Sequence, residues 1–464
     1  MLLLLLLIVF CALFFYHLHW KRLHLPPGPI PLPLVGNIPQ FSDQKKRYNK
    51  FEEWTKEFGP IYTIWLGEQP VVIFTDFEMM KQCFTKDEFA GRNFLNNHFR
   101  LFSGEVYGII RTEGELWRQM RRFTLKALRD FGLEKGTTEA MVLEAISTLI
   151  NEVEEEVQSG LKELSIDRKV DLMTGSLINK MLFGFSFYGE RYKRKVKASP
   201  FAIPSPKKRI EARKSAVYNN GDGIFLDILD QFIDQIEQTA EQNDADNFMK
   251  TNYRLKYLST LCYDLFLAGQ ETTSNTLNFL ILFLMLDQTA QAKLHAELDT
   301  VAEGKSGQTA PGGTEFRMAD RLNLPYTHAV VNESLRLSNL IPLNLHKILQ
   351  EDTEIGGHKL KKGTAVANQI ATIFPGHESF VPDRFLDENG KLKKVDELIP
   401  FGIGKRSCPG ETLGRMELVL FTANFFYKFH IYPSDPLNPP KFEKRQTFAV
   451  KLPEYSCAVT IRQH

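Results

Sequence analysis

The sequence predicts a mainly α-helical protein with small β-sheets, an α+β fold. Long stretches place apolar side chains on one helix face, about every 3.6 residues. Two short segments instead combine strand-forming residues with turn residues, which is typical of hairpins. The chain has 464 residues, of which 43% are hydrophobic, so it is long enough to bury a large core. It has no internal repeat.

Residues 1–16 form an unbroken apolar stretch that we interpret as a membrane anchor. The alternative, a cleaved signal peptide, normally begins with basic residues and ends at a small-residue cleavage site. This stretch starts with leucines and runs into Lys21 and Arg22. A vertical span needs about 20 apolar residues, so Leu18 and Trp20 are expected to complete it at the interface. The two cations predict that the rest of the chain lies on the cytoplasmic side.

A basic and proline-rich hinge, residues 21–40, follows the expected anchor of residues 1–20. Its five prolines between residues 26 and 33 exclude a helix and predict a stiff, extended spacer. Residues 41–464 are expected to form the main domain.

The two hairpin signals lie in different halves of the chain. Residues 61–66 and 71–75 are rich in Ile, Val, Tyr and Trp and are joined by a Gly-Glu-Gln-Pro turn. Residues 354–368 contain a second hairpin pattern, which we expect to turn around Gly363.

Charge and cysteine content exclude several classes of protein. Lys and Arg number 57 against 56 for Asp and Glu, so no overall positive field is available for nucleic acid. The five cysteines are odd in number and never spaced as Cys-x-x-Cys, which argues against a disulfide framework or a zinc cluster. The main domain is therefore expected in a reducing compartment.

The longest predicted helix covers residues 253–286, and its middle departs from the apolar pattern. At positions 268–273, Ala268 and Gly269 precede an acid, Glu271, and a hydroxyl, Thr272. These residues could end one helix and cap the next. In the functional interpretation, the small residues let the helix approach a flat ligand, and the hydroxyl turns toward the carbonyl one turn back.

Glu333 and Arg336 lie one turn apart on another predicted helix. Such pairs decorate many helix surfaces and each contributes only about 0.2 to 0.5 kcal/mol. A further arginine, Arg384, follows in the sequence Pro-Asp-Arg-Phe.

Cys408 lies in a ten-residue loop, Phe-Gly-Ile-Gly-Lys-Arg-Ser-Cys-Pro-Gly, at residues 401–410. Glycines allow a close approach of the backbone, and the N-terminus of the helix predicted over 413–426 places positive charge near the sulfur. A simple turn with a buried thiol is the ordinary alternative. A phosphate-binding loop is excluded because Arg406 stands where Ser or Thr is required.

The full loop pattern, Phe-x-x-Gly-x-Arg-x-Cys-x-Gly, resembles the haem-ligand signature of the cytochrome P450 family. The motifs at residues 268–273, 333–336 and 382–385 occur in the order of that family, and the resemblance covers the whole chain. The N-terminal proline hinge resembles the start of microsomal members of the family, and the chain as a whole resembles the family-two group, including its invertebrate members. The resemblance implies a cytochrome P450 fold with a single N-terminal anchor, haem b (iron protoporphyrin IX) as cofactor, and monooxygenase activity.

The resemblance also implies roles for individual residues. Cys408 would ligate the iron, and Thr272 with Glu271 would deliver protons for oxygen activation. Glu333, Arg336 and Arg384 would form a buried structural network. The remaining cofactor-binding residues would be Trp117, Arg121, His346 and Arg406 at the propionates, together with Ala268 and Phe401.

Partners and location follow from the same resemblance. Electrons would come from an NADPH-cytochrome reductase, with cytochrome b5 as a second donor, and the substrate would be an apolar small molecule. A basic helix face with Arg118, Arg122 and Lys126, together with Lys405, would steer an acidic flavoprotein domain. The protein would lie in the endoplasmic reticulum membrane.

Two other functions stay open at this point. One is a haem-thiolate isomerase that rearranges peroxides without external electrons, against which the intact Glu271 and Thr272 pair argues. The other is a membrane-tethered haem-binding protein with little turnover. It is favoured by segments 185–241 and 370–382, which are shorter than the family pattern, and by the spacing from Glu333 to His346, which is one residue short.

Overall fold

The computed structural model describes most of the main domain. The described residues are 19–42, 44–92, 106–129, 136–184, 186–188, 254–305, 314–370, 373–374, 376–445 and 449–464, with scattered residues between 5 and 16. Most of the expected anchor, most of segment 185–241 and part of segment 370–382 lie outside them. Within the described part, no helix is long and apolar enough to cross a membrane.

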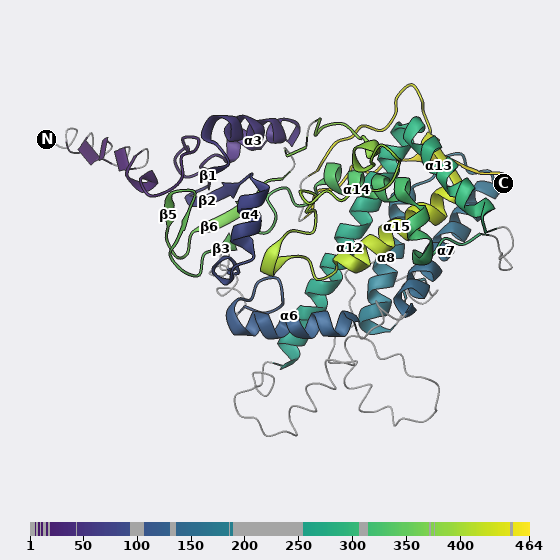
Figure 1. The fold of residues 1–464 in the computed structure, drawn as a ribbon, viewed down its shortest axis with the longest axis horizontal. Coiled ribbons are helices and arrows are strands. Elements are labelled where there is room, and N and C mark those ends of the chain that lie inside the picture. The colour runs from purple at the N-terminus through teal and green to yellow at the C-terminus, as the bar shows by residue number, and fades with distance from the viewer. Residues whose placement is uncertain are drawn as a thin grey trace, which may run out of the picture.

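The molecule has a β-sheet region at one end and a helical body at the other (Figure 1). The helical body contains α6 (Gly114–Leu128), α7 (Thr137–Gln158), α8 (Ile166–Phe183), α12 (Arg254–Leu286), α13 (Gln288–Glu303), α14 (Pro325–Ser338) and α15 (Glu411–Lys428). Their apolar faces meet in one large cluster of buried side chains. The mainly α prediction is therefore confirmed, with α12 at the centre and α8, α14 and α15 packed against it.

A four-stranded sheet has the order β1-β2-β6-β3. Its strands are β1 (Ile61–Leu66), β2 (Gln69–Phe74), β3 (Lys347–Ile348) and β6 (Ala365–Asn368). Strands β1 and β2 pair antiparallel from Ile61 with Phe74 to Leu66 with Gln69, which confirms the first predicted hairpin. Successive side chains point to opposite faces, so α3 (Gln44–Phe58) covers one face and α4 (Phe77–Phe84) the other.

The second predicted hairpin exists, but its turn was misplaced. Strands β4 (Thr353–Ile355) and β5 (His358–Leu360) pair antiparallel around Gly356 and Gly357, both at positive φ. Gly363, where we expected the turn, instead leads the chain into β6, which pairs in parallel with β2. The turn was misplaced because glycines a few residues apart can each form a turn. Only the pairing of the flanking strands decides which of them closes the hairpin.

The remaining elements are short or peripheral. They are η1 (Trp20–Arg22), α2 (Ile38–Phe41), η2 (Asp87–Phe89), η6 (Met318–Asn323), η7 (Pro382–Phe385), η8 (Gly404–Arg406), β7 (Phe429–Pro433) and β8 (Cys457–Ile461). Strands β7 and β8 form an antiparallel pair at the C-terminal end.

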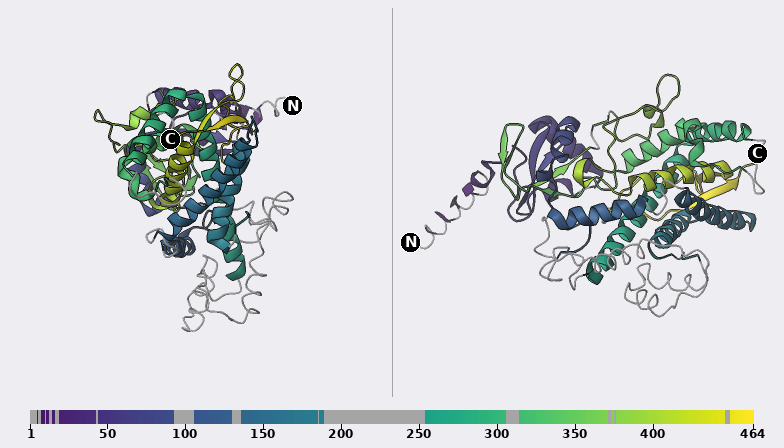
Figure 2. Two further views of the ribbon diagram at one scale, coloured as in Figure 1. Left: turned by 90° about the vertical axis from the view of Figure 1, so that its right-hand side faces the viewer. Right: turned by 60° about the horizontal axis from the view of Figure 1, so that its bottom comes forward.

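Helix α12 runs without interruption from Arg254 to Leu286, so residues 268–273 do not end one helix and cap another. Figure 2 shows α8 running beside it. A Cβ atom at Gly269 would lie 2.9 Å from Cδ1 of Ile178 on α8. The absence of a side chain at Gly269 therefore serves the close packing of two helices. Our interpretation that this glycine faces a flat ligand was wrong.

Candidate functional site

The loop around Cys408 is held by its own backbone and by the end of α4. The Cys408 N–H donates to the carbonyl of Phe401 at 2.8 Å, and Gly402 and Gly404 adopt positive φ. A Cβ atom at Gly404 would lie 1.8 Å from the carbonyl oxygen of Phe84, so this glycine allows a contact within the protein. Helix α15 begins at Glu411, three residues after the cysteine, as predicted.

Cys408 is exposed to solvent, although its sulfur has many protein atoms around it. Burial raises the pKa of the Cys408 thiol, and the nearby carboxylate of Glu411 raises it further. The Gly410 N–H, which donates to the sulfur, and the Arg121 guanidinium lower this pKa but do not outweigh burial. The positive charge near the sulfur that the sequence predicts is thus present, and a bound metal cation would lower this pKa much further.

Arg406 is locked in place beside the loop. Its Nε donates to the carbonyl of Ala90 at 2.7 Å and its Nη2 to that of Thr112 at 2.6 Å. The guanidinium lies 3.8 Å from the ring centroid of Trp117, which Arg121 also approaches at 5.8 Å. The structure thus brings together three of the four residues predicted to hold the propionates.

The fourth, His346, lies next to two cations that the sequence analysis missed. Arg92 donates from Nη1 to the carbonyl oxygens of Leu345 and of His346, the latter at 2.6 Å. Lys347 is buried, with its ammonium 4.0 Å from the ring centroid of Phe84. In the sequence, Arg92 followed only a Phe-Ala-Gly turn and Lys347 looked like an ordinary strand residue, so neither had a distinguishing signal.

The buried cationic groups lower one another's pKa values. Burial lowers the pKa of Lys347 to about 7, with further lowering from Arg92 and Arg406. Burial also lowers the pKa of His346 to about 4, and Arg92 and Lys347 add to the effect. Burial and the guanidinium groups of Arg92 and Arg121 likewise lower the pKa of Arg406. A bound anion would stabilise the charged forms of these groups.

The residues present fit a haem. A group with two carboxylates would supply the negative charge that the cation cluster lacks, and Nε of Arg92 is a buried donor without a hydrogen-bond partner among the described residues. The accessible sulfur of Cys408 is a soft ligand suited to iron. Phe401, which accepts from the Cys408 N–H, supports the loop through its carbonyl and lies 5.0 Å from the Arg415 guanidinium.

On α12, the predicted hydroxyl geometry is confirmed. Thr272 Oγ1 donates to the carbonyl oxygen of Ala268 at 2.6 Å. The Glu271 carboxylate accepts from Nδ2 of Asn275 at 3.3 Å, which holds it along the helix. Both Glu271 and Thr272 are half-buried, as are residues 267–270 before them, whereas residues 273–285 after them are buried.

The predicted Glu333 network is confirmed in its geometry. Arg336 donates to the fully buried Glu333 carboxylate through Nε at 2.6 Å and Nη2 at 2.8 Å, and Arg384 Nε donates to it at 3.1 Å. The Val381 N–H donates to the same carboxylate at 2.8 Å. Arg336 also donates to the carbonyl of Ser379 at 2.9 Å, so the network ties α14 to the chain segment before η7.

Glu417 is a buried carboxyl that the sequence analysis also missed. It lies on α15 and accepts a hydrogen bond from Thr273, the neighbour of Thr272 on α12. Burial raises the pKa of Glu417 to about 8, although the Thr273 hydrogen bond lowers it. Near neutral pH this carboxyl is therefore mostly protonated and joins the two central helices as a neutral group.

Replacing Glu417 with glutamine is expected to flatten the dependence of stability on pH. An unfolded chain releases this proton above a pKa of 4.5, whereas the folded chain keeps it up to about 8. The free energy of unfolding of the natural chain should therefore fall as pH rises through this window. Between about pH 5 and pH 8, the free energy of unfolding of the natural chain should fall by up to about 3 kcal/mol more than that of Glu417→Gln. Urea unfolding at a series of pH values measures this difference. Glu388→Gln, on an exposed turn, is the control; equal pH dependence in all three chains would contradict the prediction.

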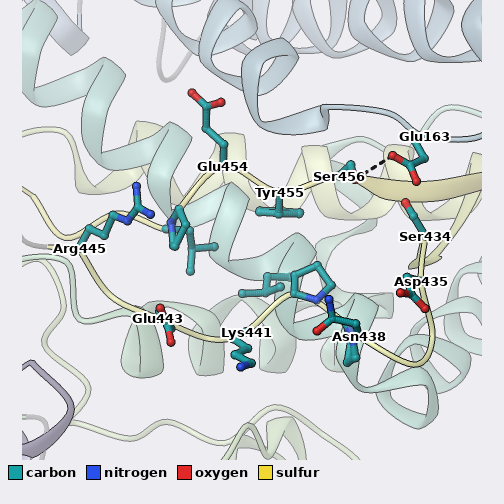
Figure 3. Close-up of a pocket in the computed structure, with 15 residues that line it drawn as sticks. Glu163, Ser434, Asp435, Asn438, Lys441, Glu443, Arg445, Glu454, Tyr455 and Ser456 are labelled. Atoms are coloured by element: carbon teal, nitrogen blue, oxygen red, sulfur yellow. Dashed lines mark hydrogen bonds between the residues drawn. The ribbon is translucent and has the colours of Figure 1, made fainter.

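A separate cavity of about 500 Å³ lies between the segment that follows β7 and the segment that precedes β8. Figure 3 shows charged side chains, including Asp435, Lys441 and Arg445, ringing it, with Tyr455 inside the ring. Neither Cys408 nor Thr272 lines it. It is therefore distinct from the candidate site.

Comparison with known proteins is consistent with this geometry. The family model described as Cytochrome P450 matches residues 26–459, a range that includes Thr272 and Cys408. Cytochrome P450 2C44 of Mus musculus is 32% identical over 453 residues, covering 88% of this chain and 87% of the relative. Cytochrome P450 2C23 of Rattus norvegicus is 33% identical over 456 residues, covering 89% of each chain. Cytochrome P450 2H2 of Gallus gallus is 30% identical over 453 residues, covering 88% and 87%.

Proposed function

Because the chain belongs to the cytochrome P450 family, and is therefore a haem-thiolate monooxygenase with haem b as its cofactor, we propose that Cys408 ligates the iron. The observation that carries this assignment is the exposure of Cys408, whose sulfur accepts a hydrogen bond from the Gly410 N–H at the start of α15. Haem bound there supplies the redox-active iron for oxygen activation. Iron binding would convert the thiol of Cys408 to a thiolate and release its proton.

The cation cluster would bind the two propionates. Arg406 and Trp117 form a rigid pair, and Arg121 is anchored by its 2.8 Å hydrogen bond to the Ser407 carbonyl. Arg92 and His346 come from two further segments of the chain, which are joined by the hydrogen bond from Arg92 to the His346 carbonyl. Because these side chains are already fixed by backbone carbonyls, they would lose little conformational entropy on binding the cofactor.

Thr272 and Glu271 would handle protons on α12. The Thr272 hydroxyl, held by the Ala268 carbonyl, can hold a water in place and pass a proton through it. The presence of both side chains favours oxygen activation over the rearrangement of a peroxide, which needs no proton delivery.

The substrate is proposed to be an apolar small molecule. Phe266 is buried on α12, two residues before Ala268. Leu340 follows α14 and is partly buried against the main core. Val450 donates its N–H to the carbonyl of Leu340 and so brings the C-terminal segment to the same region. These side chains offer apolar surface and no fixed charge.

Electrons are proposed to arrive from an NADPH-cytochrome reductase at the face that carries α6 and the Cys408 loop, with cytochrome b5 as a second donor. Arg122 and Lys126 are exposed on α6, one turn apart. Lys405 on the loop and Arg118 on α6 both lie near Asp87, at 3.4 Å and 3.7 Å. The exposed cations leave this face positive enough to attract an acidic flavoprotein domain.

Membrane attachment is proposed to rest on residues 1–20, with residues 21–40 as the hinge and residues 41–464 as the monooxygenase domain. The apolar composition of residues 1–16 and the cations after them support a single-pass location in the endoplasmic reticulum membrane. Flotation with lipid vesicles, which should be lost when residues 1–20 are deleted, tests this attachment.

The reaction is tested by supplying ¹⁸O₂ to the protein reconstituted with NADPH and a reductase, with lauric acid and 7-ethoxycoumarin as probe substrates. A monooxygenase places one labelled oxygen atom in the product and consumes NADPH. An isomerase would instead rearrange a hydroperoxide without NADPH, and a haem carrier would do neither. Thr272→Ala should keep the haem but release more hydrogen peroxide per NADPH, since its proton delivery is impaired.

A further inference from the structure

Helices α8 and α12 approach each other closely over the turn that carries Glu271. Gly269 on α12 faces Ile178, and a Cβ atom at Gly175 on α8 would lie 3.5 Å from Cγ of Gln270. With no side chain at either glycine, the two helix backbones come together here. Asp171, one turn of α8 before Gly175, is therefore brought against α12.

Asp171 is bonded to α12 on the same face as Glu271. The Ser274 hydroxyl donates to Oδ1 of Asp171 at 2.5 Å. Ser274 is three residues after Glu271, and residues at that spacing are neighbours on one helix face. The two carboxyl groups are close enough that the charge of Glu271 raises the pKa of Asp171. Asp171 thus lies on the face of α12 that carries Glu271, and Glu271 directly precedes Thr272 in the sequence.

The charged groups that face Asp171 come from three elements. Burial is the main cause that raises the pKa of Asp171. The hydrogen bond from Ser274 lowers this pKa, and the charge of Glu271 raises it. The ammonium of Lys451, on the C-terminal segment, lowers the pKa of Asp171. On α8 itself, Asp167 lies one turn earlier, and the charge of Asp171 raises the pKa of Asp167.

Asp171 also reaches solvent. Its side chain is exposed in part, even though protein surrounds most of the carboxyl, and Lys451 beside it is exposed. Glu271, in contrast, is only partly accessible and is held by Asn275. Asp171 is therefore a titratable group that is open to solvent and hydrogen-bonded to the face of α12 that carries Glu271.

We propose that Asp171 supplies protons to Glu271 from solvent, with Ser274 holding its carboxyl against α12. This inference rests on the proposed monooxygenase function, because the relay serves proton delivery in that reaction. In each transfer the Asp171 carboxyl gives its proton to the Glu271 carboxylate, and the resulting Asp171 carboxylate takes a proton from solvent. One proton moves inward, and nothing is oxidised or reduced. Asp171 acts through Glu271 and is therefore a positioning and supply residue.

The test compares Asp171→Asn with the natural chain, both loaded with haem and reconstituted with the reductase, using lauric acid and 7-ethoxycoumarin. Asparagine can still accept the Ser274 hydrogen bond but cannot carry a proton. Product formed per NADPH should fall about tenfold, hydrogen peroxide release should rise, and the solvent deuterium isotope effect on product formation should increase. Asp171→Glu should restore part of the loss.

A second readout does not depend on turnover. Infrared titration of the natural chain should show a protonated carboxyl band that persists above the ordinary range of an aspartic acid and is missing in Asp171→Asn. Asp167→Asn, one turn away on the same helix, is the matched control and should keep the product yield of the natural chain. Ser274→Ala keeps the carboxyl but frees it from α12, so it should reduce the yield less than Asp171→Asn does.

The outcomes separate this inference from the function on which it rests. If the natural chain forms no NADPH-dependent product, the proposed function fails. If the natural chain is active and Asp171→Asn matches it in product per NADPH and in isotope effect, the relay is overturned. It is also overturned if Asp171→Asn only loses haem, while each remaining haem-loaded molecule keeps the yield of the natural chain.

Discussion

Replacement of Cys408 with alanine is expected to remove the strongly red-shifted Soret band of the reduced, carbon monoxide-treated protein and to abolish monooxygenase turnover. That band depends on ligation of the iron by a thiolate, and alanine offers no ligand atom. The cation cluster would remain, since the contact of Arg406 with Trp117 does not involve the sulfur. Weak haem binding can therefore persist through the cations, without the thiolate spectrum.

Absorption spectroscopy of the purified chain measures this effect directly, and Cys262→Ala is its control. Cys262 is buried in α12, the same helix that carries Thr272, so its replacement removes a thiol from the helical body without touching the loop. The control should keep the red-shifted band. If Cys408→Ala keeps the band, or if Cys262→Ala loses it, the assignment of the ligand is wrong.

Replacement of Glu333 with alanine is the second change with a large expected effect. It leaves the guanidinium of Arg336 buried without its carboxylate, and removing one partner of a buried ion pair typically costs about 3 to 5 kcal/mol. The Val381 N–H would lose its acceptor as well. The free energy of unfolding in urea should fall by this amount, and the purified chain should retain little haem.

Lys293→Ala is a suitable control because it breaks an ion pair in the same region at the surface. The Lys293 ammonium lies 2.9 Å from Asp383, and both side chains are half exposed. Exposed pairs typically contribute about 0 to 1 kcal/mol, so this variant should keep its haem and nearly all of its stability. Similar losses in both variants would show that burial of Glu333 does not set the cost.

Local patterns in the sequence were sufficient for much of the fold. The first hairpin, the helix over 253–286 and the helix after Cys408 were all predicted, because each depends on periodicity and on turn residues within a single segment. The Thr272 hydrogen bond to Ala268 could also be predicted, since both residues lie on one turn of one helix.

Pairing between distant segments was harder to predict. The second hairpin turned at Gly356 and Gly357 because Ala365 and its neighbours pair with β2, about 290 residues earlier in the chain. Gly404 and Gly269 were assigned to a flat ligand, yet each accommodates a protein neighbour, the Phe84 carbonyl and the Ile178 side chain. A glycine shows that space is needed but does not show what fills it.

The sequence by itself determined the ligand loop of Cys408, the order of the motifs around it and the family to which they point, because these depend on residue types at fixed spacing. Only the tertiary structure decided which other side chains share the site. Arg92 and Lys347 join the cation cluster, and Asp171 reaches the turn of Glu271, through contacts between segments far apart in the chain. Charge and burial act through space, so the pKa values that they shift can be known only once those segments are packed together.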